Sequence, residues 1–163
     1  MRRGSLASLP AAPLPEGWEV RRVRAEEEGA LAEVLMAAFG TPWDASAVRR
    51  NLTEAADVEA VYVAACGDRV GATASARRDA RFPGSGYLHW VGVHPDLRGL
   101  GLGAAVTVRV LQHFADSGCP DVVLETDDFR LSAVRLYLRL GFAPEIAHTS
   151  HADRWKAVLR SLG

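Results

Sequence analysis

Cysteine and lysine are both scarce in this sequence of 163 residues, and neither sign of charge dominates. Cys66 and Cys119 lie far apart, without a Cys-x-x-Cys motif or clustered histidines, so we expect no zinc site, no other metal and no disulfide framework. Lysine and arginine together number 19, and aspartate and glutamate number 20, which leaves a net charge of −1 at pH 7. That balance gives no overall attraction to nucleic acid or to an anionic membrane.

Long apolar runs are also absent, since no stretch reaches the roughly 18 residues that a membrane-spanning helix needs. Pro10, Pro13 and Pro15 interrupt the N-terminal segment, and we expect residues 1–16 to be a disordered tail. A hydrophobic content of 48% with 24% charged residues is typical of a globular domain. We therefore predict one domain over residues 17–163, in a cytoplasmic protein that binds neither nucleic acid nor membrane.

The stretch from Tyr87 to Val106 organises the rest of the chain. Aromatic and β-branched residues between Tyr87 and Val93 indicate a strand, which Pro95 stops. A glycine-rich loop follows, and after it an Ala- and Val-rich segment without Pro or Gly is long enough for about three helical turns. The order of elements is therefore strand, glycine loop and helix.

Three alternating glycines, Gly99, Gly101 and Gly103, stand at the opening of that helix. Without a Cβ they let the backbone approach a ligand closely, and the free N–H groups and dipole of the first helical turn favour an anion. Arg98 adds a fixed charge that can form paired hydrogen bonds to phosphate. The loop fits a phosphate or pyrophosphate, although a tight strand-to-helix turn would use the same glycines.

Hydrophobic periodicity and turn residues predict the remaining elements. Strands are expected at 18–23, 58–66, 69–78 and 121–126, and helices at 26–40, 48–56 and 151–162. Residues 67–68 should form a hairpin turn, and there is room for one more strand after Phe142, up to Ala147. Because a helix connects the strand that begins at Tyr87 to the strand over 121–126, these two strands should run parallel.

Two motifs with a defined order and spacing lie between Tyr87 and Phe142. Arg98, Gly101 and Gly103 fill the pattern Arg/Gln-x-x-Gly-x-Gly/Ala, and the stretch from Ala133 carries Ala-x-x-Leu-Tyr and ends in Gly-Phe. Together they resemble the GNAT superfamily of N-acetyltransferases. The resemblance implies an α/β fold whose mixed, mainly antiparallel sheet is splayed between two parallel strands, with helices on both faces. It also implies an enzyme that moves an acetyl or acyl group from acetyl-CoA to a primary amine by direct attack.

The same resemblance implies which residues would meet coenzyme A. Tyr137 is the tyrosine that would hydrogen-bond the coenzyme A sulfur. Because the ordinary pKa is about 10 for tyrosine and about 8.5 for a thiol, full proton transfer to the thiolate is unfavourable, and we expect Tyr137 to act first as a hydrogen-bond donor. Arg130 stands where the family often has an asparagine, and an arginine could still meet a phosphate there. The other implied contacts are Val91, Gly92, Val93, Arg98, Gly99, Leu100, Gly101, Leu102, Gly103 and Ala104.

Signals for the general base and for the acceptor site are weaker. His89 and Glu125, on the two central strands, are candidate bases, and proton loss through an ordered water would need neither. Strand alternation would place His89 and Val91 on one face. Arg77, Arg78 and Arg81 could meet an acidic substrate, but a solvated sheet edge is favoured. The resemblance implies that the helix pair before the hairpin forms one wall of the acceptor site. Its candidate contacts are Phe39, Trp43 and Asn51, each of which could instead be a core or surface residue.

Two functions from other classes stay open. One is a coenzyme A binding sensor or interaction domain without catalysis. The other is a dinucleotide-binding module built on the three glycines, which lacks the Gly-x-Gly-x-x-Gly spacing. The family's usual final strand is not evident, so the lip of the acceptor site falls to the C-terminal helix, to His148 and His151, or to a second subunit of a homodimer. Nothing in the sequence identifies the acceptor amine.

Overall fold

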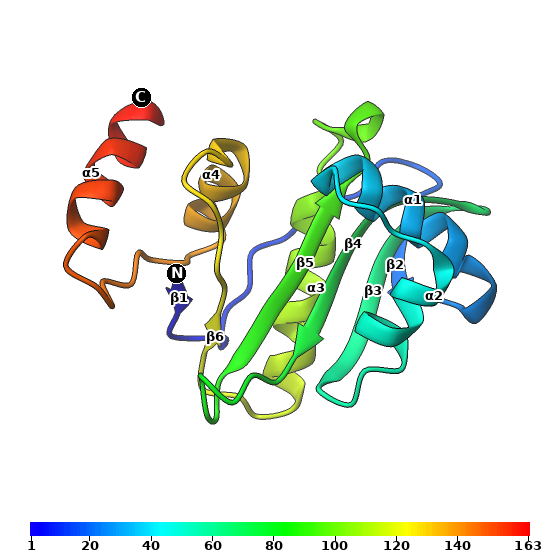
Figure 1. Cartoon of the computed structure of the whole chain (residues 1–163), viewed down its shortest axis with the longest axis horizontal. Helices are drawn as coiled ribbons and strands as arrows, with labels where there is room; N and C mark the ends of the chain where they lie inside the picture. The colour runs from blue at the N-terminus through cyan, green and yellow to red at the C-terminus, as the bar shows by residue number, and fades with distance from the viewer.

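The computed structural model describes all residues from 1 to 163 and contains six strands and five α-helices (Figure 1). The strands are β1 (Arg2–Arg3), β2 (Glu19–Arg22), β3 (Val58–Cys66), β4 (Arg69–Arg77), β5 (Gly86–Val93) and β6 (Val122–Val123). The α-helices are α1 (Glu28–Phe39), α2 (Ala45–Val48), α3 (Leu102–Asp116), α4 (Leu131–Arg139) and α5 (His151–Ser161).

All six strands belong to one mixed sheet in the order β1-β6-β5-β4-β3-β2. Neighbours from β2 to β5 are antiparallel, with β3 and β4 joined in the expected hairpin. β5 and β6 run parallel over two register pairs only, Gly86 with Val122 and Tyr87 with Val123. Beyond these pairs the two strands separate, so the mixed sheet with a central splay is confirmed.

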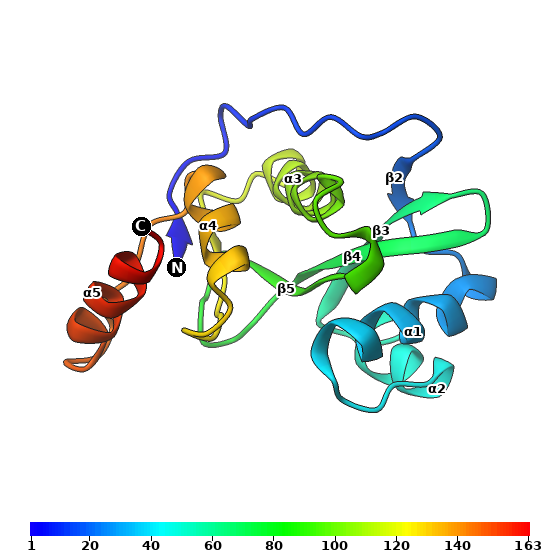
Figure 2. The same cartoon turned by 90° about the horizontal axis from the view of Figure 1, so that it is seen from above.

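Helices cover both faces of the sheet, with α3 on one face and α1 and α2 on the other (Figure 2). Val106, Val110 and Phe114 of α3 are completely buried in the core of the first face. Leu31 and Leu35 of α1 are completely buried in a second core on the opposite face. The helical spacing of apolar residues therefore predicts the buried sides of both helices correctly.

The second helix is shorter than the sequence predicts. α2 ends at Val48, and a wider π-type turn follows over Arg49–Thr53 in place of a regular helix to residue 56. Asp44 caps the start of α2, because its side chain accepts a hydrogen bond from the Ala47 N–H at 2.6 Å. The wider turn places Leu52, which is 1% exposed, in the α1 core, and this burial stabilises the irregular backbone.

The N-terminal segment differs from the disordered tail that the sequence predicts for residues 1–16. Arg2–Arg3 form β1, which pairs antiparallel with β6. Met1 and Leu124 exchange backbone hydrogen bonds of 2.8 and 3.0 Å, and Leu6 joins the α3 core with 8% exposure. The segment then crosses the outer side of α3 (Figure 2). Pairing with β1 satisfies the backbone hydrogen-bonding groups of β6 and so stabilises the N-terminal segment. The prolines that led to the prediction of disorder lie farther along the chain and give no sign of this pairing.

The C-terminal segment has no strand over residues 143–147. Its only pairing is a bridge between Ala143 and Arg2, and Pro144 has no N–H with which to extend it. The expected C-terminal helix is present as α5, beside α4 and remote from β2 (Figure 1). β1, from the other end of the chain, thus holds the position next to β6. No helix in the structure is both long enough and apolar enough to cross a membrane.

Candidate functional site

The splay leaves one edge of β5 without a strand partner. β4 pairs with the opposite edge from Tyr87 to Val93, whereas β6 accompanies β5 no farther than Tyr87. The backbone of residues 88–93 is therefore free on the β6 side. An extended ligand that carries amide groups can pair with such an edge as an additional strand would.

A β-bulge interrupts β5 beside this free edge. The register with β4 shifts so that His89 pairs with Ser75 and Gly92 with Thr73. Trp90 and Val91 therefore lie opposite Ala74 alone, which makes β5 one residue longer than β4 at this point. Trp90 has a φ of +48°, and no other residue except glycine has a positive φ. The bulge turns backbone groups out of the regular ladder at the centre of the splay.

The bulge also corrects the expected side-chain alternation. His89 and Trp90 both line a cavity on the α1 and α2 face, while Val91 packs with the core on the α3 face. The prediction that His89 and Val91 share a face was wrong because an extra residue reverses the alternation beyond it.

The glycine loop enters α3 through two left-handed residues. Gly99 and Gly101 have φ angles of +84° and +81°, a region that strains residues with a Cβ. Gly103 serves another purpose, because a Cβ at this position would lie only 3.0 Å from Cγ2 of Val93. The three glycines thus shape the turn and allow α3 to approach the end of β5.

The first turn of α3 is open to an anion. Its first backbone hydrogen bond joins the Ala105 N–H to the Gly101 carbonyl at 3.1 Å, so the N–H groups of residues 102–104 have no acceptor in the helix. No side chain caps this end, and the first turn contains no acidic residue. Arg98 is exposed at the mouth of the loop. These features fit the expected phosphate site at the end of the free edge of β5.

Tyr137 lies on α4, the helix that follows β6 across the splay. It is 6% exposed, and its ring packs edge to face on Phe142 with a centroid distance of 5.8 Å. Burial raises the pKa of Tyr137, against a smaller opposing effect of Arg130, and the hydroxyl has no hydrogen-bond partner within the chain. The adjacent Leu136 is close to Gly103, since a Cβ built there would lie 3.6 Å from Leu136 Cδ2. A protonated donor without a partner therefore stands on the helix that lies beside the first turn of α3.

Arg130 connects the two sides of the splay. Its guanidinium lies 4.9 Å from the ring centre of Phe39, at the end of α1, and 5.3 Å from that of Phe129. Its Nε donates to Asp127 at 2.9 Å. Because the guanidinium is stacked on Phe39 and paired with Asp127, this geometry does not favour the phosphate contact expected for Arg130.

His89 is held by an arginine that is itself paired with a carboxylate. Arg77 donates two hydrogen bonds to Asp57 Oδ2, of 2.8 and 2.5 Å, and lies 3.4 Å from Nδ1 of His89. An arginine can only donate, so Nδ1 is the acceptor and Nε2 carries the proton. Burial, reinforced by the charge of Arg77, lowers the pKa of His89 to about 4. His89 is therefore a neutral donor near pH 7 and a weak base.

Glu125, the other candidate base, lines a different cavity from His89. It accepts hydrogen bonds from the Tyr87 hydroxyl at 2.8 Å and from Arg81 at 2.8 Å. Partial burial by itself would raise the pKa of Glu125, but these two donors outweigh it and lower the pKa. Glu125 lines a smaller hollow of about 180 Å³, together with Met1 and with His151 of α5. The two candidate bases therefore face different cavities.

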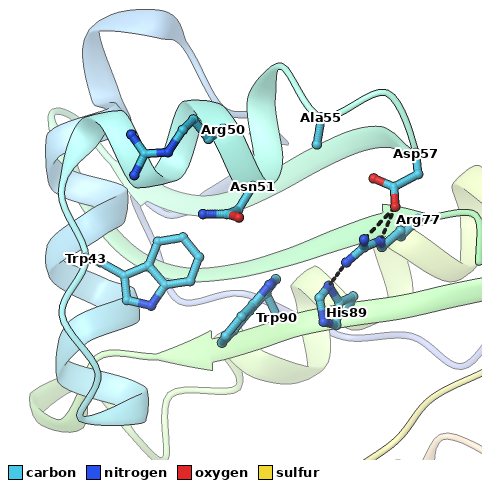
Figure 3. A pocket seen from close by; sticks show the side chains of 8 residues that line it. All are labelled: Trp43, Arg50, Asn51, Ala55, Asp57, Arg77, His89 and Trp90. Carbon is cyan, nitrogen blue, oxygen red and sulfur yellow. Dashed lines mark hydrogen bonds and ion pairs between the residues drawn. The ribbon is translucent and has the colours of Figure 1, made fainter.

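A cavity of about 330 Å³ opens on the α1 and α2 face beside the bulge (Figure 3). Trp43 and Trp90 pack edge to face with ring centres 4.9 Å apart, and Phe39 packs on Trp90 at the same distance. In Figure 3 Trp43 lies at one end, below Arg50, and Trp90 lies between Trp43 and His89. Asp57 and Arg77 lie at the other end. The lining residues are Trp43, Arg50, Asn51, Ala55, Asp57, Arg77, His89 and Trp90.

Sequence reasoning found part of this lining. Trp43 and Asn51, two of the three candidate contacts that could instead be core or surface residues, line the cavity, while Phe39 packs against Trp90 without lining it. Arg77 was interpreted as a solvated edge, and Asp57 was missed. The hairpin turn contained the signal, because it sets Val58 opposite Arg77 and so brings the preceding aspartate near the arginine. No residue of α5 lines this cavity, so the C-terminal helix does not form its lip.

Known acetyltransferases are similar to this chain in sequence and in architecture. Residues 29–142 match the model of the Acetyltransferase (GNAT) family. A mycothiol acetyltransferase of Pseudarthrobacter chlorophenolicus is 36% identical over 149 residues, which cover 83% of this chain and 46% of the relative. A GCN5-related N-acetyltransferase from Sphaerobacter thermophilus superposes with a TM-score of 0.69 at 25% identity, over 88% of this chain and 47% of that chain. An aminoglycoside N-acetyltransferase solved in complex with coenzyme A has a TM-score of 0.67 at 18% identity, over 81% and 93% of the two chains.

This chain spans about half the length of the curated relatives it matches. Its match to the family model runs from the first turn of α1 to Phe142, and includes the bulged strand, the glycine loop and Tyr137. The observed splay, the open first turn of α3 and the sequence match agree, and the chain belongs to the GNAT family of acetyltransferases.

Proposed function

We propose that the chain transfers an acetyl or short acyl group from acetyl-CoA to a primary amine by direct attack. One observation carries the proposal: the free edge of β5 leads from the uncapped first turn of α3 to the bulge, and the bulge opens on the cavity. We place the reaction in the cytoplasm, where the free thiols of Cys66 and Cys119 would stay reduced.

The residues along this path fit coenzyme A. The N–H groups of residues 99–104 and the guanidinium of Arg98 would hold the pyrophosphate. The amides of the pantetheine arm would pair with Val91, Gly92 and Val93 at the free edge of β5. The structural neighbour that was solved with coenzyme A supports the choice of this co-substrate.

The reaction then needs two contributions from the chain. The amine nitrogen forms a bond to the thioester carbonyl carbon, and backbone N–H groups at the bulge of Trp90 and Val91 would stabilise the resulting oxyanion. The carbon–sulfur bond breaks and its electron pair stays on sulfur. Tyr137 would donate a hydrogen bond to this thiolate, because burial keeps its hydroxyl protonated.

The proton of the amine is proposed to leave through water. His89 uses Nδ1 to accept from Arg77 and has a pKa near 4, so it is poorly suited to take a proton near pH 7. Glu125 is bonded to two donors and lies outside the cavity. We therefore expect the rate to rise with pH as the neutral fraction of the amine grows, without an inflection from either residue between pH 5 and 8.

Thermal unfolding with acetyl-CoA, coenzyme A and a nicotinamide dinucleotide in parallel tests the co-substrate. A ligand at about 100 times its dissociation constant adds about 2.7 kcal/mol to the free energy of unfolding, which should raise the midpoint by roughly 5 °C. A shift with the coenzyme A pair alone is expected. A shift with the dinucleotide alone would overturn the proposal in favour of the dinucleotide-binding module.

Release of free coenzyme A in the presence of a panel of primary amines tests catalysis. Amine-dependent release is expected, with a product heavier by one acetyl group in the mass spectrum. Binding of acetyl-CoA without release from any amine would favour the alternative of a sensor or interaction domain.

A further inference from the structure

We propose that the amine acceptor is a small molecule that carries a carboxylate or a phosphate, and that Arg50 binds this anionic group at the end of the cavity where Trp43 lies. The inference rests on the proposed acetyl transfer and names the chemical class of its acceptor. The anion would lie over Trp43, while the amine reaches the bulge at Trp90 (Figure 3).

The charges that line the cavity do not balance. Asp57 and Arg77 neutralise one another through their two hydrogen bonds. Arg50 contacts only the hydroxyl of Ser46 and pairs with no carboxylate. His89 is neutral near pH 7. One uncompensated positive charge therefore faces the cavity, and an acceptor with a negative group would balance it.

The cavity has both donors and acceptors without a partner, and the acceptors are Oδ1 of Asp57 and Oδ1 of Asn51. Among the groups without a charged partner, only Arg50 carries a net charge. The proton on Nε2 of His89 and most of the Arg50 fork are unused, whereas the Trp43 indole N–H is bonded to Thr41 at 3.2 Å. Asn51 donates to the Ala47 carbonyl at 2.8 Å. Carboxylates and phosphates accept several hydrogen bonds and suit such a lining. A polyamine would bring a second ammonium, for which the cavity has no unpaired carboxylate.

The size and walls of the cavity favour a small molecule. Its volume of about 330 Å³ lies near the lower end of the roughly 300–1,000 Å³ typical of ligand sites. Trp43 and Trp90 offer apolar surface for a short carbon skeleton. We therefore do not expect a long peptide to be required.

Matched amines test the proposal. Glucosamine and glucosamine 6-phosphate differ by a phosphate, and β-alaninamide and β-alanine differ in whether the distal group is charged. Putrescine supplies a second positive charge instead. The measurement is kcat/KM from coenzyme A release at one ionic strength, after acetyl-CoA binding has been established by thermal shift. We expect the anionic member of at least one pair to exceed its neutral partner about tenfold or more, and putrescine to be the poorest acceptor.

Variants assign the preference to Arg50. Arg50→Gln should lower kcat/KM for the preferred anionic amine about 10- to 100-fold, the range for a lost hydrogen bond to a charged group, and should raise KM more than it lowers kcat. Arg50→Lys keeps the charge and should recover part of the loss. Arg69→Gln, at the exposed start of β4 on the hairpin turn, is the matched control and should not change the ratio between paired amines. Because Arg50 and Arg69 are both exposed, all three variants should fold.

Four outcomes separate this inference from the proposed function. A preference for anionic amines that Arg50→Gln removes supports it. Equal or better use of the neutral amines, or of putrescine, overturns it and leaves acetyl transfer standing. A preference that survives Arg50→Gln overturns the role of Arg50. Acetyl-CoA binding without acetylation of any amine overturns the proposed function and this inference with it.

Discussion

The ring of Tyr137 is buried and its hydroxyl has no hydrogen-bond partner within the chain, so removal of the hydroxyl should separate catalysis from stability. In Tyr137→Phe no intramolecular hydrogen bond is lost. The free energy of unfolding should therefore change by less than about 0.5 kcal/mol. Urea denaturation gives this value directly from the midpoint at constant slope.

The effect on turnover should be large by comparison. A hydrogen bond to a charged sulfur is worth about 1.5–3 kcal/mol, which corresponds to a decrease in kcat of about 10- to 100-fold. The thioester of bound acetyl-CoA carries little charge before it reacts, so KM for acetyl-CoA should change by less than about threefold. Initial rates of coenzyme A release over a range of both substrates separate the two parameters.

Tyr62 provides a matched control within the same core. It is 1% exposed, and its hydroxyl lies 3.2 Å from Nδ1 of His113. Tyr62→Phe should lower the free energy of unfolding by about 1 kcal/mol and leave kcat unchanged. The two tyrosines thus predict opposite patterns for the same chemical substitution.

Two results would refute the reasoning about Tyr137. If Tyr137→Phe retains kcat within about threefold of the parent, the hydroxyl does not assist the leaving thiolate. If it lowers stability as much as Tyr62→Phe does, the hydroxyl has a partner in solution that the structure does not contain. Either result would contradict the proposal that the coenzyme A sulfur lies beside the Tyr137 hydroxyl.

Gly101→Ala places a Cβ at a φ of +81° and should lower the free energy of unfolding by about 1 kcal/mol and the affinity for acetyl-CoA about tenfold. Gly118→Ala, at a φ of +72° with no neighbour near the added Cβ, should lower stability alone. Calorimetric titration with acetyl-CoA distinguishes the two variants. For His89, the folded-state pKa near 4 is below the ordinary 6.5, so the unfolded state takes up the proton first as pH falls, and stability present above pH 6.5 is lost progressively toward pH 4. His89→Gln should flatten this part of the urea-derived stability curve, and an unchanged slope would contradict the assignment. Removal of residues 1–6 withdraws Met1 and Leu6 from the core and should lower the free energy of unfolding by about 2–4 kcal/mol, while an unchanged urea midpoint would show that the segment is not docked.

The glycine loop and the Tyr137 helix were predictable because their chemistry is local. Left-handed φ angles, absent Cβ atoms and free N–H groups at a helix start all arise within a few consecutive residues, and Gly99 to Gly103 contain every one of them. The hairpin at residues 67–68 is local in the same sense. These segments were sufficient to predict the fold class and the path proposed for coenzyme A.

Other features depend on partners that are distant in sequence. β1 forms because β6 offers unpaired backbone groups more than a hundred residues away, and the composition of residues 1–16 contains no sign of this pairing. The bulge at Trp90 is a difference in length between two paired strands, which the periodicity of either strand alone does not reveal.

The sequence by itself therefore determined the order of elements, the glycine loop and the position of the tyrosine, since short-range backbone geometry specifies each of them. Only the tertiary structure decided what surrounds the acceptor. It brings Arg77 between Asp57 and His89, which makes the histidine a neutral donor, and it leaves Arg50 facing the same cavity without a carboxylate. The electrostatic potential in the cavity depends on charged groups from several helices and strands. Their positions relative to one another are set only when the chain folds.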